Sequence, residues 1–176
     1  MKNAIIFHGG GETPGSFWYQ WLKKELEKKR YTVSVPLLPD SEDMELSKWL
    51  PIAIKENYNS NTTLIGHSAG SPLILSVLER INVKIKQAIL VAGFALPLKT
   101  EESKKILQKK YNWEKIKGNC EEFIFINSDN DPWGCNDKQG GYMLDHLDGK
   151  LIVPKGEGYE LTQAANKSAV QVTYYT

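Results

Sequence analysis

The sequence has little that would suit it to nucleic acid or to a membrane. Its 22 lysine and arginine residues stand against 21 aspartate and glutamate residues, a net charge of +1, so there is no net basic field to attract a polyanion. The longest apolar stretch, Ala88 to Leu98, falls short of the ~20 residues that a membrane-spanning helix needs. We therefore expect neither nucleic acid nor a membrane as a partner.

Cysteine and recognisable cofactor motifs are also scarce. The two cysteines, Cys120 and Cys135, are too few for a disulfide framework and lack metal-ligand spacing, so we expect two reduced structural thiols. With no dinucleotide fingerprint either, we expect no metal and no cofactor. The N-terminus passes directly into an apolar run and a glycine loop without a signal region, which predicts a cytoplasmic protein.

What the sequence does contain is an alternation of short apolar runs with helical patterns. This alternation indicates βα units and a parallel sheet, and 176 residues suit a single domain, 1–176, with one buried core. The expected strands are Ala4–Phe7, Tyr31–Val35, Thr62–Ile65, Gln87–Val91, Phe123–Ile126 and Leu151–Val153. The predicted fold class is α/β: a doubly wound, mostly parallel sheet of about six strands, with its site at the carboxyl ends of the strands.

Two helical patterns lie between the first three expected strands. Ser16 is expected to cap the first, whose apolar face would hold Phe17, Trp21, Leu22 and Leu26. The second carries Leu46, Trp49, Leu50 and Ile54. Pro51 lies inside it and is expected to kink or divide that helix.

A short motif that carries chemistry follows the third expected strand. Gly66-His67-Ser68-Ala69-Gly70 stands between Thr62–Ile65 and an apolar run at helical spacing. A serine at the tip of such a strand-turn-helix unit has an exposed Oγ, and the helix presents free backbone N–H groups to an anion. The pattern indicates the nucleophile elbow of an α/β-hydrolase, with Ser68 as the nucleophile. A serine in an ordinary βα loop is the plainer alternative.

A second motif, His8-Gly9-Gly10-Gly11-Glu12, directly follows the first expected strand. In an α/β-hydrolase the loop there supplies one N–H to the oxyanion hole, and the residue after the nucleophile supplies the other. The candidate donors are the amides of Gly9 or Gly10 and of Ala69, with His8 orienting the loop. A phosphate-binding loop is the competing interpretation, but the stretch has neither the G-x-G-x-x-G nor the P-loop pattern.

The acid of a serine triad should follow a late strand, because the order in this fold is serine, acid, histidine. The loop Ser128–Trp133 follows the expected strand Phe123–Ile126 and offers Asp131, with Asp129 as the second candidate. The plainer alternative is that both aspartates only form Asx turns, as Asp and Asn readily do in loops.

Together these motifs resemble the small serine hydrolases related to retinoblastoma-binding protein nine, compact α/β-hydrolases without a large lid. The resemblance runs from Ala4 to about Gly158. Its most specific patches are Trp18–Lys28, Trp49-Leu50-Pro51, the elbow, Asn112–Lys117 with Asn119-Cys120, and Asp131-Pro132. The resemblance implies that Ser68 is the nucleophile, Asp131 the acid and the glycine loop part of the oxyanion hole.

The sequence departs from that family at the general base. The family has a histidine after a glycine in the loop that follows the last strand, whereas here Gly158 leads to Tyr159 and no histidine lies beyond His146. A phenol with an unperturbed pKa of ~10 cannot accept the serine proton efficiently near neutral pH. His146 is expected at a solvated helix position and His67 is held inside the turn, so neither is expected to replace it.

The tail, residues 159–176, is atypical as well. Its helical pattern over Glu160–Val170 has a weak apolar face, and Gln171–Thr176 alternates as strands do. A substituted, a frameshifted or an engineered C-terminus would each give this pattern.

Two functions remain open at this point. The first is hydrolysis of a small ester, thioester or amide through a seryl acyl-enzyme. The alternative is a catalytically inactive hydrolase fold that binds a small ligand or a protein partner, with Trp18, Trp49, Trp113 or Trp133 around the pocket. In both cases the loops Phe94–Glu102 and Trp133–Gly140 are expected to shape the pocket.

Overall fold

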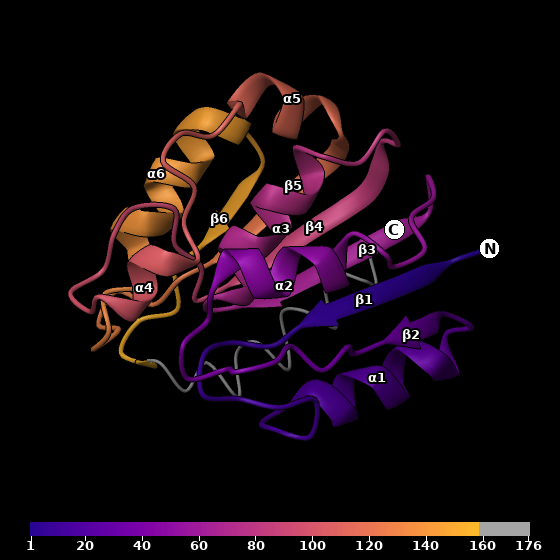
Figure 1. Cartoon of the computed structure of the whole chain (residues 1–176), viewed down its shortest axis with the longest axis horizontal. Helices are drawn as coiled ribbons and strands as arrows, with labels where there is room; N and C mark the ends of the chain where they lie inside the picture. Colours follow the sequence, from indigo (N-terminus) through magenta and orange to yellow (C-terminus); the bar gives the residue numbers. More distant parts are fainter. Residues whose placement is uncertain (159–176) are drawn as a thin grey trace.

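The computed structural model describes residues 1–158, which form a parallel sheet flanked by helices (Figure 1). The strands are β1 (Asn3–Phe7), β2 (Thr32–Ser34), β3 (Thr62–His67), β4 (Ile85–Val91), β5 (Cys120–Ile126) and β6 (Lys150–Ile152). Their order in the sheet is β2-β1-β3-β4-β5-β6, and every neighbouring pair is parallel. The predicted α/β class and six-stranded parallel sheet are confirmed.

The helices of the described residues are distributed along the whole width of the sheet. They are α1 (Tyr19–Lys28), α2 (Leu46–Ala53), α3 (Gly70–Leu78), α4 (Glu102–Lys105), α5 (Trp113–Gly118) and α6 (Asp137–Leu147). In Figure 1, α1 lies beside β2 at one edge and α6 beside β5 and β6 at the other, while α3 packs over β1, β3 and β4. No helix among these residues is long and apolar enough to cross a membrane.

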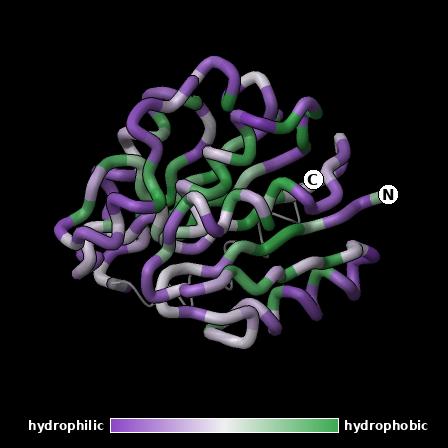
Figure 2. Tube along the Cα trace, viewed as in Figure 1, coloured by the Kyte–Doolittle hydropathy of each residue, from purple (hydrophilic) through white to green (hydrophobic). Residues whose placement is uncertain are grey.

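The core is concentrated in the middle of the sheet and in α3. Figure 2 shows hydrophobic residues along the central strands and polar residues toward the periphery. All six residues of β3 are buried, as is typical of a parallel strand that is covered on both faces. Every residue of α3 is buried as well, so this helix is enclosed between the sheet and its neighbouring helices.

The position of β1 creates a crevice at one end of the sheet. β1 pairs with β2 on one side and with β3 on the other, so the chain leaves this point in opposite directions. In open α/β sheets such a switch point is where ligands bind, just beyond the carboxyl ends of the strands. β3 extends through Gly66 and His67, farther than the sequence indicated, and it therefore ends directly at Ser68.

The start of α1 differs from the sequence prediction. The helix begins at Tyr19, and the residue before it, Trp18, makes no side-chain cap. The Oγ of Ser16 instead accepts the backbone N–H of Thr13 at 3.0 Å. The prediction of a Ser16 cap is therefore wrong, because this hydroxyl is used inside the preceding turn.

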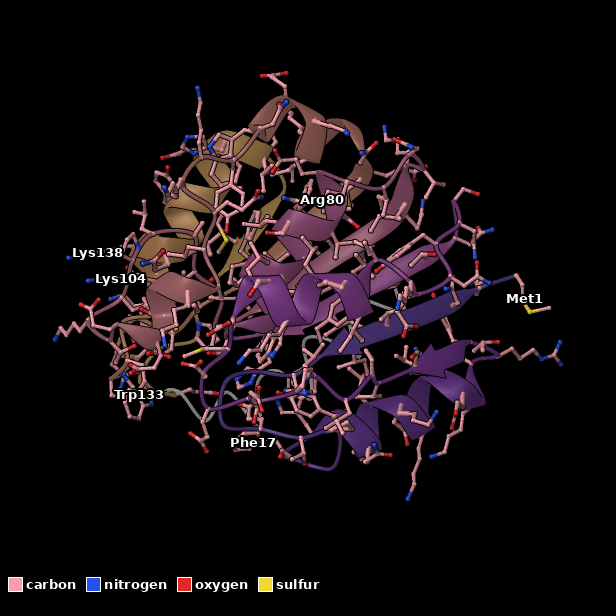
Figure 3. All side chains as sticks on the ribbon, in the orientation of Figure 1. Met1, Phe17, Arg80, Lys104, Trp133 and Lys138 are labelled. Atoms are coloured by element: carbon pink, nitrogen blue, oxygen red, sulfur yellow. The ribbon has the colours of Figure 1, made fainter. Side chains whose placement is uncertain are left out.

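The prediction for the buried face of α1 is also wrong in part. Phe17 lies before the helix with a φ of 47° and is 53% exposed at the surface (Figure 3). Trp21 is 41% exposed, and the buried face consists of Tyr19, Leu22 and Leu26. Phe17 precedes the helix, and Trp21 lies on the side of α1 away from the three buried residues.

α2 contains the proline that was expected to disturb it. Pro51 does not divide the helix, which continues to Ala53. Division of the helix is therefore ruled out, and a kink at Pro51 stays a prediction.

Candidate active site

Ser68 lies at the junction of β3 and α3 in a strained conformation. Its φ is 49°, a left-handed value that non-glycine residues adopt only when the surroundings impose it. The amide of Ser68 donates to the carbonyl of Val91 at 2.9 Å, and the amide of Ser71 donates to the carbonyl of Ser68 at 2.9 Å. The predicted strand-turn-helix unit with Ser68 at its tip is confirmed.

Two glycines allow α3 to start this close to the sheet. A Cβ on Gly66 would lie 2.7 Å from the carbonyl carbon of Gly70. A Cβ on Gly70 would lie 2.3 Å from the carbonyl oxygen of Phe7. Only glycine fits where backbone meets backbone at such distances, so the elbow depends on both residues.

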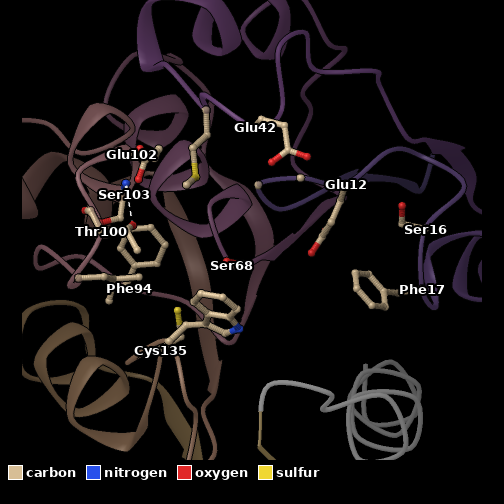
Figure 4. Close-up of a pocket in the computed structure, with 15 residues that line it drawn as sticks. Glu12, Ser16, Phe17, Glu42, Ser68, Phe94, Thr100, Glu102, Ser103 and Cys135 are labelled. Carbon is tan, nitrogen blue, oxygen red and sulfur yellow. Dashed lines mark hydrogen bonds between the residues drawn. The ribbon is translucent and has the colours of Figure 1, made fainter.

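A cavity of about 790 Å³ opens at Ser68 (Figure 4). Besides the elbow with Ser68, its walls come from four segments: the loop after β1, the segment before α2, the loop after β4 with the start of α4, and the loop after β5. Phe94, Leu98 and Glu102 line it from the third segment, and Trp133 and Cys135 from the fourth. The predicted contribution of the loops Phe94–Glu102 and Trp133–Gly140 is confirmed.

Of the four tryptophans considered for the pocket, Trp133 lines it. Trp49 is fully buried and its Nε1 donates to the carbonyl of Pro39 at 2.8 Å. Trp18 is buried against Tyr19. Trp113 lines a separate cavity of about 490 Å³ between α5 and the loop after β4. These three tryptophans are therefore not part of the cavity wall.

The carboxylate of Glu12 anchors the glycine loop. Its Oε2 accepts the N–H of Gly9 at 2.6 Å and the hydroxyl of Tyr19. The Nδ1 of His67 lies 3.0 Å from Oε1, so one buried side chain connects the loop after β1, the start of α1 and the end of β3. Burial acts to raise the pKa of Glu12, but the bonds from His67, Tyr19 and Gly9 outweigh it and hold that pKa below its usual value.

This arrangement distinguishes the candidate oxyanion donors. The N–H of Gly9 is used by Glu12 inside the loop. The N–H groups of Gly10 and Ala69 donate to no acceptor within residues 1–158. Gly10 also lines the cavity, so its amide can meet a ligand there. Ala69 is buried next to Ser68, and its part in an oxyanion hole stays a prediction.

His8 holds the other side of the same loop. The N–H of Leu38 donates to Nε2 of His8 at 3.0 Å, so the ring proton is on Nδ1, which donates to the carbonyl of Gly9 at 2.9 Å. Burial lowers the pKa of His8, against the smaller effects of Gly9 and Glu12. A neutral ring with both nitrogens engaged orients the loop and does not accept a further proton.

Asp131 is the buried carboxylate of the loop after β5. Its Oδ1 accepts the amides of Trp133 at 2.9 Å and Cys135 at 3.1 Å. Its Oδ2 is buried and meets no donor among the described residues. Such an atom is costly to bury, and the exceptions that proteins keep often belong to catalytic groups.

The neighbouring residues Asp129 and Asn130 have a different role. The Oδ1 of Asp129 accepts the amide of Gly156 at 2.9 Å, and the Oδ1 of Asn130 accepts the amide of Gly158 at 2.8 Å. These bonds attach the segment after β6 to the loop that carries Asp131. Tyr159 and the patterns expected over 160–176 lie outside the described residues.

None of the three histidines, His8, His67 and His146, lines the cavity. The Nδ1 of His146 donates to the carbonyl of Tyr142 at 2.8 Å. Its ring lies against Trp113 and Tyr142, with ring centroids 4.5 Å apart in each pair. His146 is therefore on the expected helix but half-buried, because α5 packs on α6, and the prediction of a solvated position is corrected.

Sequence reasoning missed two side chains of the site. Cys135 lines the same cavity as Ser68. Burial raises the pKa of its thiol, so it stays protonated and cannot act as a base near neutral pH. The residues around Cys135 are polar, and none of them indicated that Cys135 lines a cavity. Glu12 was indicated only by its place at the end of the motif that begins with His8. Within residues 1–158, no group of three or more His, Cys, Asp or Glu side chains could hold a metal ion.

Replacing Glu12 with glutamine is expected to lower the free energy of unfolding by about 2 kcal/mol at pH 7, because charge-assisted hydrogen bonds are lost. The folded-state pKa of Glu12 lies below its unfolded value, so its contribution is complete above the unfolded pKa of ~4.3. The contribution disappears as the pH falls through the folded pKa. Urea unfolding of both proteins at neutral and acidic pH should show the difference narrowing in acid, and a constant difference would contradict this assignment.

Comparison with known sequences gives consistent findings. The family model described as serine hydrolase matches residues 4–167. The serine hydrolase RBBP9 of Rattus norvegicus is 30% identical over 151 residues, which cover 82% of this chain and 78% of that protein. YdeN of Bacillus subtilis (strain 168) is 32% identical over 103 residues, which cover 56% of this chain and 54% of that protein.

Comparison with solved structures shows the same fold. The crystal structure of the ydeN gene product of B. subtilis has a TM-score of 0.88 at 24% identity and covers 99% of both chains. Est1E from Butyrivibrio proteoclasticus has a TM-score of 0.71 at 14% identity, covering 99% of this chain and 89% of that one. At these identities the likeness concerns the arrangement of strands and helices.

Proposed function

Because the chain belongs to the serine hydrolase family, we propose that its cavity hydrolyses a small ester, thioester or amide through a seryl acyl-enzyme. The observation that carries the proposal is the strained serine: Ser68 has a φ of 49° and lines a cavity of about 790 Å³. A backbone held in this conformation at the mouth of a helix presents Oγ to a bound carbonyl.

In this mechanism the Oγ of Ser68 attacks the carbonyl carbon, and the developing oxyanion is held by two amides. The amide of Ala69 is one, and the amide of Gly10 is favoured over that of Gly9, since Gly9 already donates to Glu12. The alcohol, thiol or amine then leaves with the proton that Oγ gave up. Water attacks the acyl group on Ser68, which releases a carboxylic acid and restores the serine hydroxyl. Asp131 is the acid that would orient a base.

No general base for Ser68 is found among residues 1–158. The three histidines are bound elsewhere, and the buried Oδ2 of Asp131 has no donor within residues 1–158. Tyr159 stands where the family resemblance places a histidine. Without a general base, a serine hydrolase retains a rate about 10³–10⁴-fold above water from its oxyanion hole and substrate binding, so we expect slow turnover.

An inactive protein that binds a ligand or a protein partner is the second candidate. It is favoured by the exposure of Phe17 and Trp133, at 53% and 57%, on the wall of the cavity. Large exposed apolar side chains gathered at one place are typical of a binding surface. The cytoplasmic location expected from the sequence stays a prediction under either function.

A fluorophosphonate probe separates the two candidates, because it forms a covalent adduct only with a serine that the site activates. We expect slow labelling, with the adduct located by mass spectrometry on the peptide that contains Ser68 and absent in Ser68→Ala. An adduct on another serine of the cavity, Ser16 or Ser103, would contradict the role of Ser68. A folded protein that never reacts would favour the binding protein.

A further inference from the structure

The cavity at Ser68 has an acidic lining. Three carboxylates face it, those of Glu12, Glu42 and Glu102, and no lysine or arginine of residues 1–158 lines it. Figure 4 draws these carboxylates around Ser68. A ligand that enters therefore meets negative charge with no compensating cation on the cavity wall.

The three carboxylates are not equivalent. Glu12 is 4% exposed and its charge is offset by donors from Gly9, Tyr19 and His67. Glu42 and Glu102 are exposed, and neither forms an ion pair among the described residues. The negative charge that a ligand would experience comes chiefly from these two side chains.

The nearby lysines pair with other carboxylates. Lys48, in the first turn of α2, forms ion pairs with three carboxylates of the segment before that helix: Asp40, Asp43 and Glu45, at 3.0, 3.8 and 3.8 Å. The ammonium of Lys105, on the helix of Glu102, pairs with Asp43. Glu42 is thus the one carboxylate of its segment without an ion pair within residues 1–158, and it is also the one that faces the cavity.

Two aromatic rings provide an independent sign of the ligand. Phe17 and Trp133 both line the cavity while exposing 53% and 57% of their surface. Figure 3 shows both at the end of the molecule toward which the strands point. Ring faces attract cations, and rings together with carboxylates are the usual recognition site for alkylated ammonium groups.

We propose that this cavity selects esters or thioesters that carry an alkylammonium group. The cation would lie between the ring faces and the carboxylates of Glu42 and Glu102 while the ester carbonyl is at Ser68. The same two carboxylates would repel substrates with an anionic group. This inference rests on the proposed hydrolase function and adds the charge of its substrate.

The test compares two substrates of nearly the same shape. Butyrylthiocholine and S-(3,3-dimethylbutyl) thiobutyrate differ in a quaternary nitrogen that replaces a carbon, and hydrolysis of both releases a thiol that can be measured. We expect kcat/KM to favour the charged thioester by roughly tenfold, the effect of a cation near exposed carboxylates and rings. The preference should fall as salt is raised from about 20 to about 500 mM, because salt screens exposed charges.

Matched variants assign the preference to its residues. In a Glu42→Gln, Glu102→Gln double variant the ratio of the two kcat/KM values should fall toward one. Glu101→Gln removes the same charge next to Glu102, but Glu101 pairs with Lys104 and does not line the cavity. In this control the ratio of the two kcat/KM values should equal that of the unmodified chain. If the ratio falls as far as in the double variant, the preference is a general effect of charge and not of Glu42 and Glu102.

The outcomes separate this inference from the proposed function. Hydrolysis of both thioesters through Ser68 with a ratio near one would overturn the inference and leave the hydrolase. Absence of any hydrolysis would count against the hydrolase. In that case the affinities for choline and for 3,3-dimethylbutanol, each measured by calorimetry, would decide the charge preference. Equal affinity for those two compounds would overturn the inference.

Discussion

Tyr159→His is expected to raise kcat/KM for an activated ester such as p-nitrophenyl acetate by two or more orders of magnitude, the typical contribution of a general base. An imidazole with a pKa of ~6.5 can accept the serine proton and return it to the leaving group, which a phenol with a pKa of ~10 cannot do near neutral pH. The amide of Gly158 is held by Asn130 at 2.8 Å, one residue from Asp131, whose Oδ2 has no donor within residues 1–158.

Two further variants show whether a gain comes from imidazole. Tyr159→Phe should give no gain, because it removes the hydroxyl without adding a base. Asp131→Asn in the histidine variant should remove most of the gain, since the carboxylate orients the ring and stabilises its charged form. No gain in a folded Tyr159→His protein would favour the binding function. A fast unmodified chain that His146→Ala inactivates would show instead a rearranged triad.

Gly70→Ala is expected to lower the free energy of unfolding by about 3 kcal/mol or more, at or beyond the upper end of the range for overpacked sites. The added Cβ would lie 2.3 Å from the carbonyl oxygen of Phe7 and 3.0 Å from that of His8. Both are backbone atoms at the end of β1, so no side chain can move aside to make room. Urea unfolding measures the loss of stability. A variant that does not accumulate as folded protein would show that the loss exceeds the stability of the parent.

Gly141→Ala is the matched control for this prediction. Gly141 lies within α6 and a Cβ there would meet nothing within 4 Å. Alanine is favoured over glycine inside a helix by roughly 0.5–1 kcal/mol, so this variant should be slightly more stable than the parent. A loss as large as that of Gly70→Ala would contradict the steric explanation.

The strand pattern could be predicted because parallel strands that are covered on both faces are nearly continuous apolar runs. Their ends were harder to place. Gly66 and His67 have the composition of a turn yet belong to β3, because pairing with β1 and β4 extends the strand to the nucleophile. Phe17 was assigned to a buried helix face from its hydropathy alone, whereas in the structure it lines the cavity.

The parts of the site that lie within one short segment were visible in the sequence. The elbow and the glycine loop are of this kind, since each is a contiguous motif whose chemistry follows from its own residues. The contacts of Glu12 with Tyr19 and His67 join three segments of the chain, and a single sequence without its fold does not show which distant residues meet. The same holds for Cys135 beside Ser68.

The neighbouring positions of β1 and β3 have a consequence for synthesis on the ribosome. Phe7 stands opposite Gly66 in the sheet, although β2 and two helices separate them along the chain. Parallel pairing over such a separation is slow, because the chain between the strands must be ordered first. The glycine loop leaves the ribosome before Ser68 does, but the two come together only after β3 has emerged and paired with β1. During synthesis the cavity at Ser68 is therefore completed late, because its walls also need the loops after β4 and β5.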